Sequence, residues 1–159
     1  MSRENKSYII DGKEVWESRS IATALIIYRG DGENTEILAI KRGPAVNNTG
    51  KWSIPCGYLN WDESIYESAC REAYEETGIK IDTSDIKLIE IVDQYKTKKQ
   101  NVVLYFITKY DGEGYNIPEN ILEFSKNEVS EIEWVKIYDE GQNKVQKMVK
   151  NFVKKHVSI

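Results

Sequence analysis

Short apolar runs alternate with longer polar stretches along the chain, a pattern typical of several strands combined with a few helices. The runs at 21–30 and 35–43 are rich in β-branched and aliphatic residues and flank "GDGEN", so they predict an antiparallel hairpin. The runs at 85–95 and 101–110 flank the polar turn "KTKKQ" and predict a second hairpin. Further extended segments are expected at 52–60 and 131–138.

Two segments have helical periodicity instead. The first is expected to begin with Asp62 as its N-cap and to run to about Thr77, with Gly78 as the residue that ends it. The second, within 140–157, places its lysines on one face and apolar residues on the other. The apolar face of this C-terminal helix contains Val145, Met148, Val149, Phe152 and Val153.

Strands before and after a central helix, with a further helix at the end, predict an α/β fold in which a mixed sheet lies between helices. The length of 159 residues fits a single domain, 1–159. Two interpretations of 1–19 remain open. This segment is either an additional strand pair or an arm that contacts a second subunit, which would make the protein a homodimer.

The composition is that of an ordinary globular protein, with 40% hydrophobic and 30% charged residues and a net charge of −4. This charge gives no reason to expect duplex nucleic acid or an anionic membrane as a partner. Two cysteines and one histidine do not make a Cys/His zinc set. No apolar leader is visible at the N-terminus, and we expect reduced thiols and a cytoplasmic location.

Acidic side chains crowd into the first helix within "ACREAYEETGI" (69–79). Each helical residue advances by about 100°, so Glu72, Glu75 and Glu76 share a sector of roughly 100°. Ala69 and Ala73, which are small enough to pack on a sheet, fall on the same side of the helix. The carboxylates therefore point toward the packed interface, where their pKa values rise unless positive charge lies nearby.

Two kinds of positive charge could stabilise these carboxylates at the packed interface. A hard divalent cation such as Mg²⁺ binds one or two carboxylates together with waters and substrate phosphates. Alternatively, Arg71 forms a structural network, since it lies four residues from both Glu67 and Glu75.

The residues from 57 to 79 resemble the Nudix box, G-x5-E-x7-R-E-U-x-E-E-x-G-U, in which U is a bulky aliphatic residue. Only Ala73, at the first U position, departs from the pattern. The matching residues are Gly57, Glu63, Arg71, Glu72, Glu75, Glu76, Gly78 and Ile79. The resemblance extends from about residue 20 onward. It implies the Nudix-type α/β/α sandwich and hydrolysis of a diphosphate linkage with Mg²⁺ or Mn²⁺.

The same resemblance implies roles for individual residues. Glu72 and Glu76 resemble the principal metal ligands, and Glu75 a further or water-mediated one. The backbone at Cys56 and Gly57 resembles another part of the metal site. Arg71 resembles the partner of Glu63 in a structural ion pair beside the catalytic glutamates.

The general base varies among Nudix hydrolases, and a late glutamate serves in some of them. Glu128 is our candidate here, with Glu131 and Glu123 as rivals. Among candidates for substrate binding, Arg42 is a phosphate ligand or a strand-edge charge. Trp52 and Tyr28 either stack on a nucleobase or pack in the core.

We therefore expect a pyrophosphohydrolase that acts on a nucleotide or a nucleoside-diphosphate derivative. The alternative is a non-catalytic nucleotide-binding regulatory module on the same fold. An isomerase of isoprenoid diphosphates is a third and more distant possibility.

Overall fold

The computed structural model describes residues 3–112, 115–139 and 143–157. Its main body is a seven-stranded mixed sheet, in which β3 and β8 run parallel and the remaining pairs are antiparallel. The strands of this sheet are β3 (Ile21–Arg29), β4 (Glu36–Arg42), β5 (Trp52–Ser53), β6 (Cys56–Tyr58), β7 (Lys87–Asp93), β8 (Val102–Lys109) and β9 (Val129–Lys136). The predicted strand segments are thus all present.

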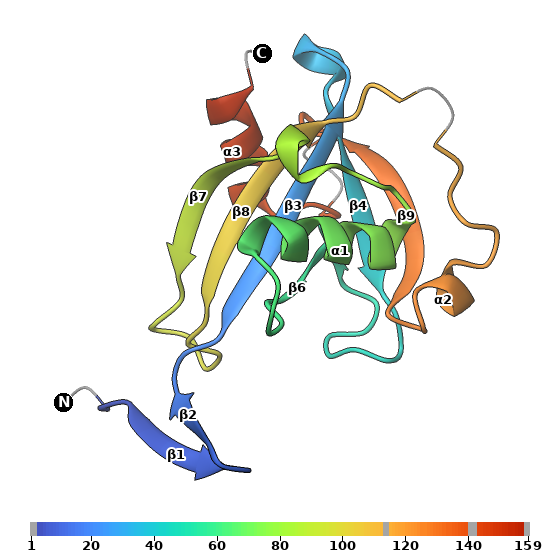
Figure 1. The fold of residues 1–159 in the computed structure, drawn as a ribbon. Coiled ribbons are helices and arrows are strands. Elements are labelled where there is room, and N and C mark those ends of the chain that lie inside the picture. The colour runs from blue at the N-terminus through green and yellow to red at the C-terminus, as the bar shows by residue number, and fades with distance from the viewer. Residues whose placement is uncertain (1–2, 113–114, 140–142, 158–159) are drawn as a thin grey trace.

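Helices cover both faces of the sheet, as Figure 1 shows, so the predicted α/β/α arrangement is confirmed. Helix α1 (Ile65–Thr77) packs through Ala69 and Ala73 on one face, and α3 (Lys147–His156) packs through Val149 and Val153 on the other. The short helices are η1 (Gly32–Asn34), η2 (Thr83–Asp85) and α2 (Ile121–Phe124). Because both faces of β3 are covered, its sequence is apolar almost throughout rather than alternating.

The predicted hairpin of β3 and β4 is paired only at its closed end. Tyr28 and Arg29 pair with Ile37 and Glu36, and beyond this point the two strands separate. The short strands β5 and β6 fill the gap, since β5 pairs with β4 and β6 pairs with β3. The second predicted hairpin, β7 with β8, is antiparallel as expected.

Helix α1 begins later than the sequence pattern suggested. Its N-cap is Ser64, whose hydroxyl accepts a hydrogen bond from the Glu67 amide, while the Glu67 carboxylate accepts one from the Ser64 amide. This capping box competes successfully with Asp62, which instead lies in the preceding turn with a φ of 62°. Gly78 ends the helix in the left-handed conformation, as predicted.

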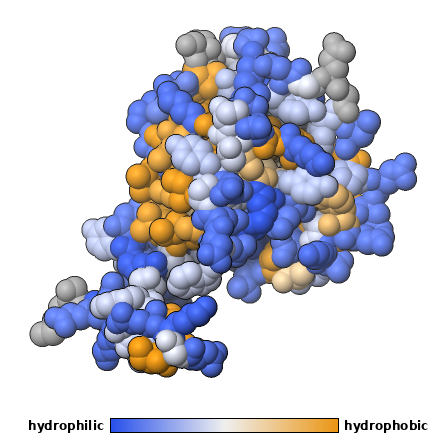
Figure 2. Space-filling view, in the orientation of Figure 1, coloured by the Kyte–Doolittle hydropathy of each residue, from blue (hydrophilic) through white to orange (hydrophobic). Residues whose placement is uncertain are grey.

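The N-terminal segment forms a separate two-stranded hairpin of β1 (Lys6–Ile10) and β2 (Lys13–Glu17). It projects from the body as a distinct lobe (Figures 1 and 2). Tyr8, Ile9 and Trp16 are exposed there. The strand interpretation of this segment is therefore correct, while its proposed contact with a second subunit stays a prediction.

At the C-terminus, the helix expected within 140–157 is shorter and occupies Lys147–His156. Residues 140–142 lie outside the described residues. Val145 precedes the helix but is buried against it, in line with the predicted apolar stripe. No helix in the described ranges is both long and apolar enough to cross a membrane.

Candidate active site

A cavity of about 620 Å³ opens beside the gap between β3 and β4, a volume within the range of small-molecule sites. One end holds Glu72, Glu76 and Glu128. The cavity continues across the sheet to the turn before β8 and is bounded by the N-terminal end of α3 through Gln146 and Val149. This cavity brings together residues that lie far apart in the sequence.

Alternation along β6 explains how a glutamate of α1 reaches this cavity. Gly57 lies opposite Thr23, whose hydroxyl is 2.9 Å from that of Ser68 on α1, so both face the helix. A Cβ atom at Gly57 would lie 2.1 Å from Cδ and Oε1 of Glu72. Only a residue without a side chain therefore leaves room for the Glu72 carboxylate.

Glu76 is fixed from the same helix by a backbone contact. The amide of Cys56 donates a hydrogen bond of 2.9 Å to Oε2 of Glu76, and only 5% of Glu76 is exposed. Burial raises the pKa of Glu76 well above its ordinary value, and Glu72 and Glu128 raise it further. Burial also raises the pKa of Glu72, although its hydrogen bond with Arg71 opposes the shift.

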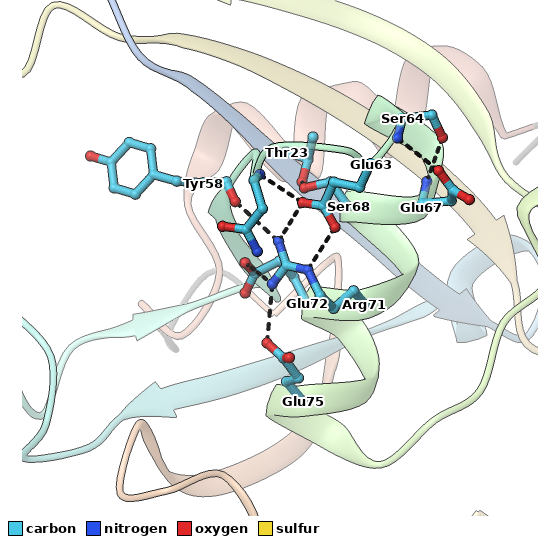
Figure 3. A network of polar contacts seen from close by, with 10 residues as sticks. Thr23, Tyr58, Glu63, Ser64, Glu67, Ser68, Arg71, Glu72 and Glu75 are labelled. Carbon is cyan, nitrogen blue, oxygen red and sulfur yellow. Dashed lines mark hydrogen bonds and ion pairs between the residues drawn. The ribbon is translucent and has the colours of Figure 1, made fainter. Parts of the chain in front are cut away.

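Arg71 joins the glutamates into one network, shown in Figure 3. Its Nε and Nη2 atoms donate to the two carboxylate oxygens of Glu63 at 2.8 and 2.7 Å. Its Nη1 atom donates to Glu72 Oε1 at 2.7 Å and to Glu75 Oε2 at 3.1 Å. The guanidinium holds the pKa of Glu63 at about 2. Arg71 therefore forms the ion pair that the motif implies, and it also contacts Glu72 directly.

The predicted convergence of three glutamates holds for two of them in this arrangement. Glu75 is half exposed and turns toward Arg71, away from the cavity that Glu72 and Glu76 line. Glu67 does not contact Arg71, because it completes the capping box. In the part of the chain that the structure describes, no three His, Cys, Asp or Glu side chains are already gathered around one point as a metal-binding group.

The donor set at the carboxylate end nevertheless fits Mg²⁺ or Mn²⁺. Two buried carboxylates with raised pKa values are groups whose ionised forms a cation would stabilise. Mg²⁺ commonly takes one or two carboxylates and completes its shell with waters and substrate phosphates, so a larger protein cluster is unnecessary. Glu72 and Glu76 would hold the ion, with the adjacent backbone at Cys56 and Gly57 as the further predicted element.

The turn before β9 brings Glu128 to the same cavity. Lys126 and Asn127 adopt left-handed conformations, and the Ser125 hydroxyl accepts a hydrogen bond of 3.0 Å from the Val129 amide. The Gly43 amide also donates to the Glu128 carbonyl at 2.7 Å, which ties the turn to the loop after β4. Glu128 lines the cavity and acts electrostatically on both buried glutamates.

The rival glutamates lie elsewhere. Glu131 is an exposed partner of Lys41 at 2.6 Å, and Glu123 bonds to Asn120 at the start of α2. Neither lines the cavity. Glu128 is therefore the late carboxylate that the fold brings to the other two.

Of the three candidates for substrate binding, two line the cavity and one does not. Arg42 and Trp52 line the cavity, and Arg42 is oriented by a 2.7 Å hydrogen bond from its Nε to the Asn47 carbonyl. Tyr28 does not line it, because it lies at the closed end of the β3–β4 hairpin and packs against the core. We therefore do not retain Tyr28 as a substrate ligand.

Other cavity residues were not among the sequence candidates. Gln94, Lys99 and Asn101 come from the segment between β7 and β8, and Lys51 comes from the loop before β5. The period-two alternation of Asn101 with Val103 and Tyr105 was a usable signal, since all three share one face of the sheet.

Cys56 lies beside the carboxylates without the properties of a nucleophile. Burial, together with the negative charge of the neighbouring Glu76, raises the pKa of its thiol to about 12. A thiol in such a position stays protonated near neutral pH and is a poor nucleophile. The backbone of Cys56, which bonds Glu76, is its visible contribution to the site.

Comparisons with known proteins agree with this geometry. The family model described as "NUDIX domain" matches residues 18–154. A "MutT-like protein" of Streptomyces ambofaciens is 33% identical over 94 residues, which cover 58% of this chain and 53% of that protein. "Nudix hydrolase 7" of Arabidopsis thaliana is 28% identical over 135 residues, which cover 81% of this chain and 44% of that protein.

This chain thus spans about half the length of these two relatives. Among solved structures, the NUDIX domain of Shewanella oneidensis NrtR in complex with ADP ribose aligns with a TM-score of 0.70. The alignment has 14% identity and covers 89% of this chain and 90% of that one, so it supports the fold. The resemblance drawn from Gly57 to Ile79 is confirmed, and because the family model matches most of the chain, this chain belongs to the NUDIX domain family.

Proposed function

We propose that this protein is a metal-dependent pyrophosphohydrolase that cleaves the diphosphate linkage of a nucleotide or a nucleoside-diphosphate derivative. The observation that carries the proposal is the burial of Glu72 and Glu76 beside Glu128 at one end of a ligand-sized cavity. Arg42, Lys51 and Lys99 line the same cavity and supply positive charge for an anionic substrate.

In the proposed reaction, water adds to one phosphorus atom and the bridging P–O bond breaks, which leaves two products that each end in a phosphate. A bound divalent ion would neutralise phosphate charge and lower the pKa of the attacking water. Glu72 and Glu76 are the residues we propose to hold that ion.

The protein's own groups would then handle protons and orientation. Glu128 lines the cavity near both buried glutamates, and a carboxylate in this position is suited to accept a proton from water. Arg42 would orient a phosphate, because its guanidinium is already positioned by the Asn47 carbonyl. Arg71 would act as a positioning residue through its bond to Glu72.

A non-catalytic binding module on this fold would not need paired buried carboxylates. Retention of Glu72 and Glu76, with a glycine that makes room for one of them, favours the enzyme. Two sources support nucleotide derivatives as the substrate class: the ligand of the NrtR structure, which is ADP ribose, and the size of the cavity.

The test is product identification on a panel of ADP-ribose, nucleoside triphosphates, dinucleoside polyphosphates and dinucleotide cofactors, with Mg²⁺ and with Mn²⁺. We expect at least one compound to be split at its diphosphate and the reaction to stop when EDTA removes the ion. Tight binding of a panel member without turnover in either metal would instead identify the regulatory module. A homodimer, a cytoplasmic location and the absence of duplex nucleic acid and membrane as partners remain part of the proposal.

A further inference from the structure

Two buried side-chain polar atoms in the described part of the chain have no hydrogen-bond partner, namely Oγ of Ser53 and Oδ1 of Asn101. Both residues line the cavity that holds the carboxylates. Buried polar atoms without partners are rare, because each costs the free energy of its lost hydration. Their location in one cavity indicates that a ligand supplies the missing partners.

Asn101 is the more informative of the two, because only 5% of it is exposed and its backbone is anchored. Its carbonyl accepts hydrogen bonds from the Gln94 amide at 3.0 Å and from Nη2 of Arg19 at 3.4 Å. Arg19 also donates to the Gln100 carbonyl at 2.6 Å and pairs with Asp93. These contacts fix the backbone of the turn before β8 and therefore the position from which the Asn101 side chain extends.

The floor between Asn101 and the carboxylate end is apolar. Ala22 and Ala24 of β3 and Val103 and Tyr105 of β8 line the cavity on the face opposite α1. The two alanines are small, so they leave depth over the middle of the sheet for a flat or ring-shaped group. An apolar floor with a few polar groups at its edges is the usual lining of a small-molecule site.

The dimensions match a nucleoside diphosphate. Cys56 pairs with Ala24, and Ala24 pairs with Tyr105, four residues from Asn101. Two strand spacings and four residue steps therefore separate the Cα atoms of Cys56 and Asn101, which amounts to roughly 16 Å. An extended nucleoside diphosphate covers this span, with its phosphates near Glu76 and its nucleoside near Asn101.

We propose that Asn101 is a specificity-determining residue that accepts a hydrogen bond from an N–H or O–H donor at the nucleoside end of the substrate. This inference rests on the proposed function and specifies which end of the substrate lies where. The donor belongs either to the exocyclic amino group of the base or to the ribose, and the two sources are distinguishable by probe.

The experiment measures binding by isothermal titration calorimetry with Mg²⁺ present, using diphosphates whose bridging oxygen is replaced by methylene so that they are not cleaved. The probes are α,β-methylene-ADP, its purine-riboside counterpart without the amino group, its 2′-deoxy and 3′-deoxy counterparts, and methylenediphosphonate without any nucleoside. The proteins are the wild type, Asn101→Leu and the control Asn151→Leu, which changes an exposed asparagine on α3.

We expect Asn101→Leu to bind α,β-methylene-ADP about ten-fold more weakly than the wild type. The wild type should prefer α,β-methylene-ADP to the probe that lacks the donor, and Asn101→Leu should lose that preference. Methylenediphosphonate should bind both proteins equally, and Asn151→Leu should match the wild type throughout. The melting temperature of Asn101→Leu should not fall, because leucine has a similar shape and leaves no polar atom unpaired.

Equal affinities of the wild type and Asn101→Leu for all nucleoside probes would overturn the inference. An equal loss of affinity for methylenediphosphonate, or a lowered melting temperature, would also overturn it, because either result indicates a structural role. Turnover of the substrate panel is measured separately. If the protein turns over a substrate but Asn101→Leu binds the nucleoside probes as the wild type does, only this inference is contradicted. If binding depends on Asn101 but no substrate is turned over, only the proposed reaction is contradicted.

Discussion

The replacement Gly57→Ala separates the stability of the fold from the integrity of the site. The added Cβ would lie 2.1 Å from Cδ of Glu72. An ordinary carbon–carbon contact is about 3.5–4.0 Å, so the overlap is roughly 1.5 Å and the carboxylate must move. Because the clashing atoms belong to the end of a flexible side chain, the backbone can keep its place.

The expected stability cost is the hydrogen bond between Glu72 and Arg71, about 1–2 kcal/mol. Part of this cost is offset by the lower entropy of the unfolded chain with alanine, about 0.4–1 kcal/mol. We therefore expect a net loss of roughly 1 kcal/mol in a urea unfolding experiment. Activity on the best panel substrate should fall by about 100-fold or more, because a misplaced group of this kind typically costs that much.

A double-mutant cycle with Glu72→Ala tests the cause. In that background the clashing carboxylate is gone, so Gly57→Ala should be stabilising by about 0.4–1 kcal/mol. The reasoning would be refuted by an equal stability loss in both backgrounds, or by a Gly57→Ala enzyme within about twofold of wild-type activity.

Three further predictions concern the network around Arg71 and the buried thiol. Arg71→Lys should lower the free energy of unfolding by about 2 kcal/mol, because lysine lacks the planar guanidinium that bonds both oxygens of Glu63. An unchanged midpoint of urea unfolding would show instead that the positive charge alone suffices. Because the pKa of Glu63 is depressed to about 2, its stabilising effect should be complete above the ordinary glutamate pKa and should decline as the pH falls toward 2. The difference in unfolding free energy between the wild type and Glu63→Gln should therefore shrink over that pH range, and a constant difference would contradict this prediction. Cys56→Ser should keep hydrolytic activity within about threefold of the wild type, because a thiol with a pKa of about 12 is not a nucleophile near neutral pH. Loss of all activity in a correctly folded Cys56→Ser protein would show that the thiol takes part in the reaction.

The parts of the site that local periodicity determines could be predicted from the sequence. The helical repeat places Glu72 and Glu76 on the packed side of α1, and both are buried in the structure. The same repeat also put Glu75 in this sector, but its exposed position and its ion pair with Arg71 turn it away. A periodic pattern gives the direction of the Cα–Cβ bond, whereas the partner decides where a long side chain ends.

The start of α1 shows a signal that was present and was missed. Asp62 and Ser64 are both good N-cap residues, but only Ser64 has a glutamate three positions later, at Glu67. The reciprocal pair of hydrogen bonds therefore selects Ser64. The pair of Ser64 and Glu67 is therefore the pattern in the sequence that locates the helix start.

Local sequence patterns did not predict the contacts between segments that lie far apart in the chain. The separation of β3 from β4, which creates the cavity, depends on the insertion of β5 and β6 between them. The approach of Glu128 depends on two left-handed residues, Lys126 and Asn127, in the preceding turn. Asn101 reaches the cavity because β8 runs parallel to β3, a pairing that no neighbouring sequence encodes.

The most direct test of the central claim compares Glu76→Gln with Glu67→Gln, two identical chemical changes on the same helix. Glutamine at either position keeps its local hydrogen bond, since it can still accept from the Cys56 amide or complete the capping box. With Mg²⁺ and the best panel substrate, kcat/KM of Glu76→Gln should fall by about 1,000-fold, while Glu67→Gln stays within about threefold of wild type. If Glu76→Gln hydrolyses the substrate as fast as Glu67→Gln does, the buried carboxylates of α1 are not the catalytic centre.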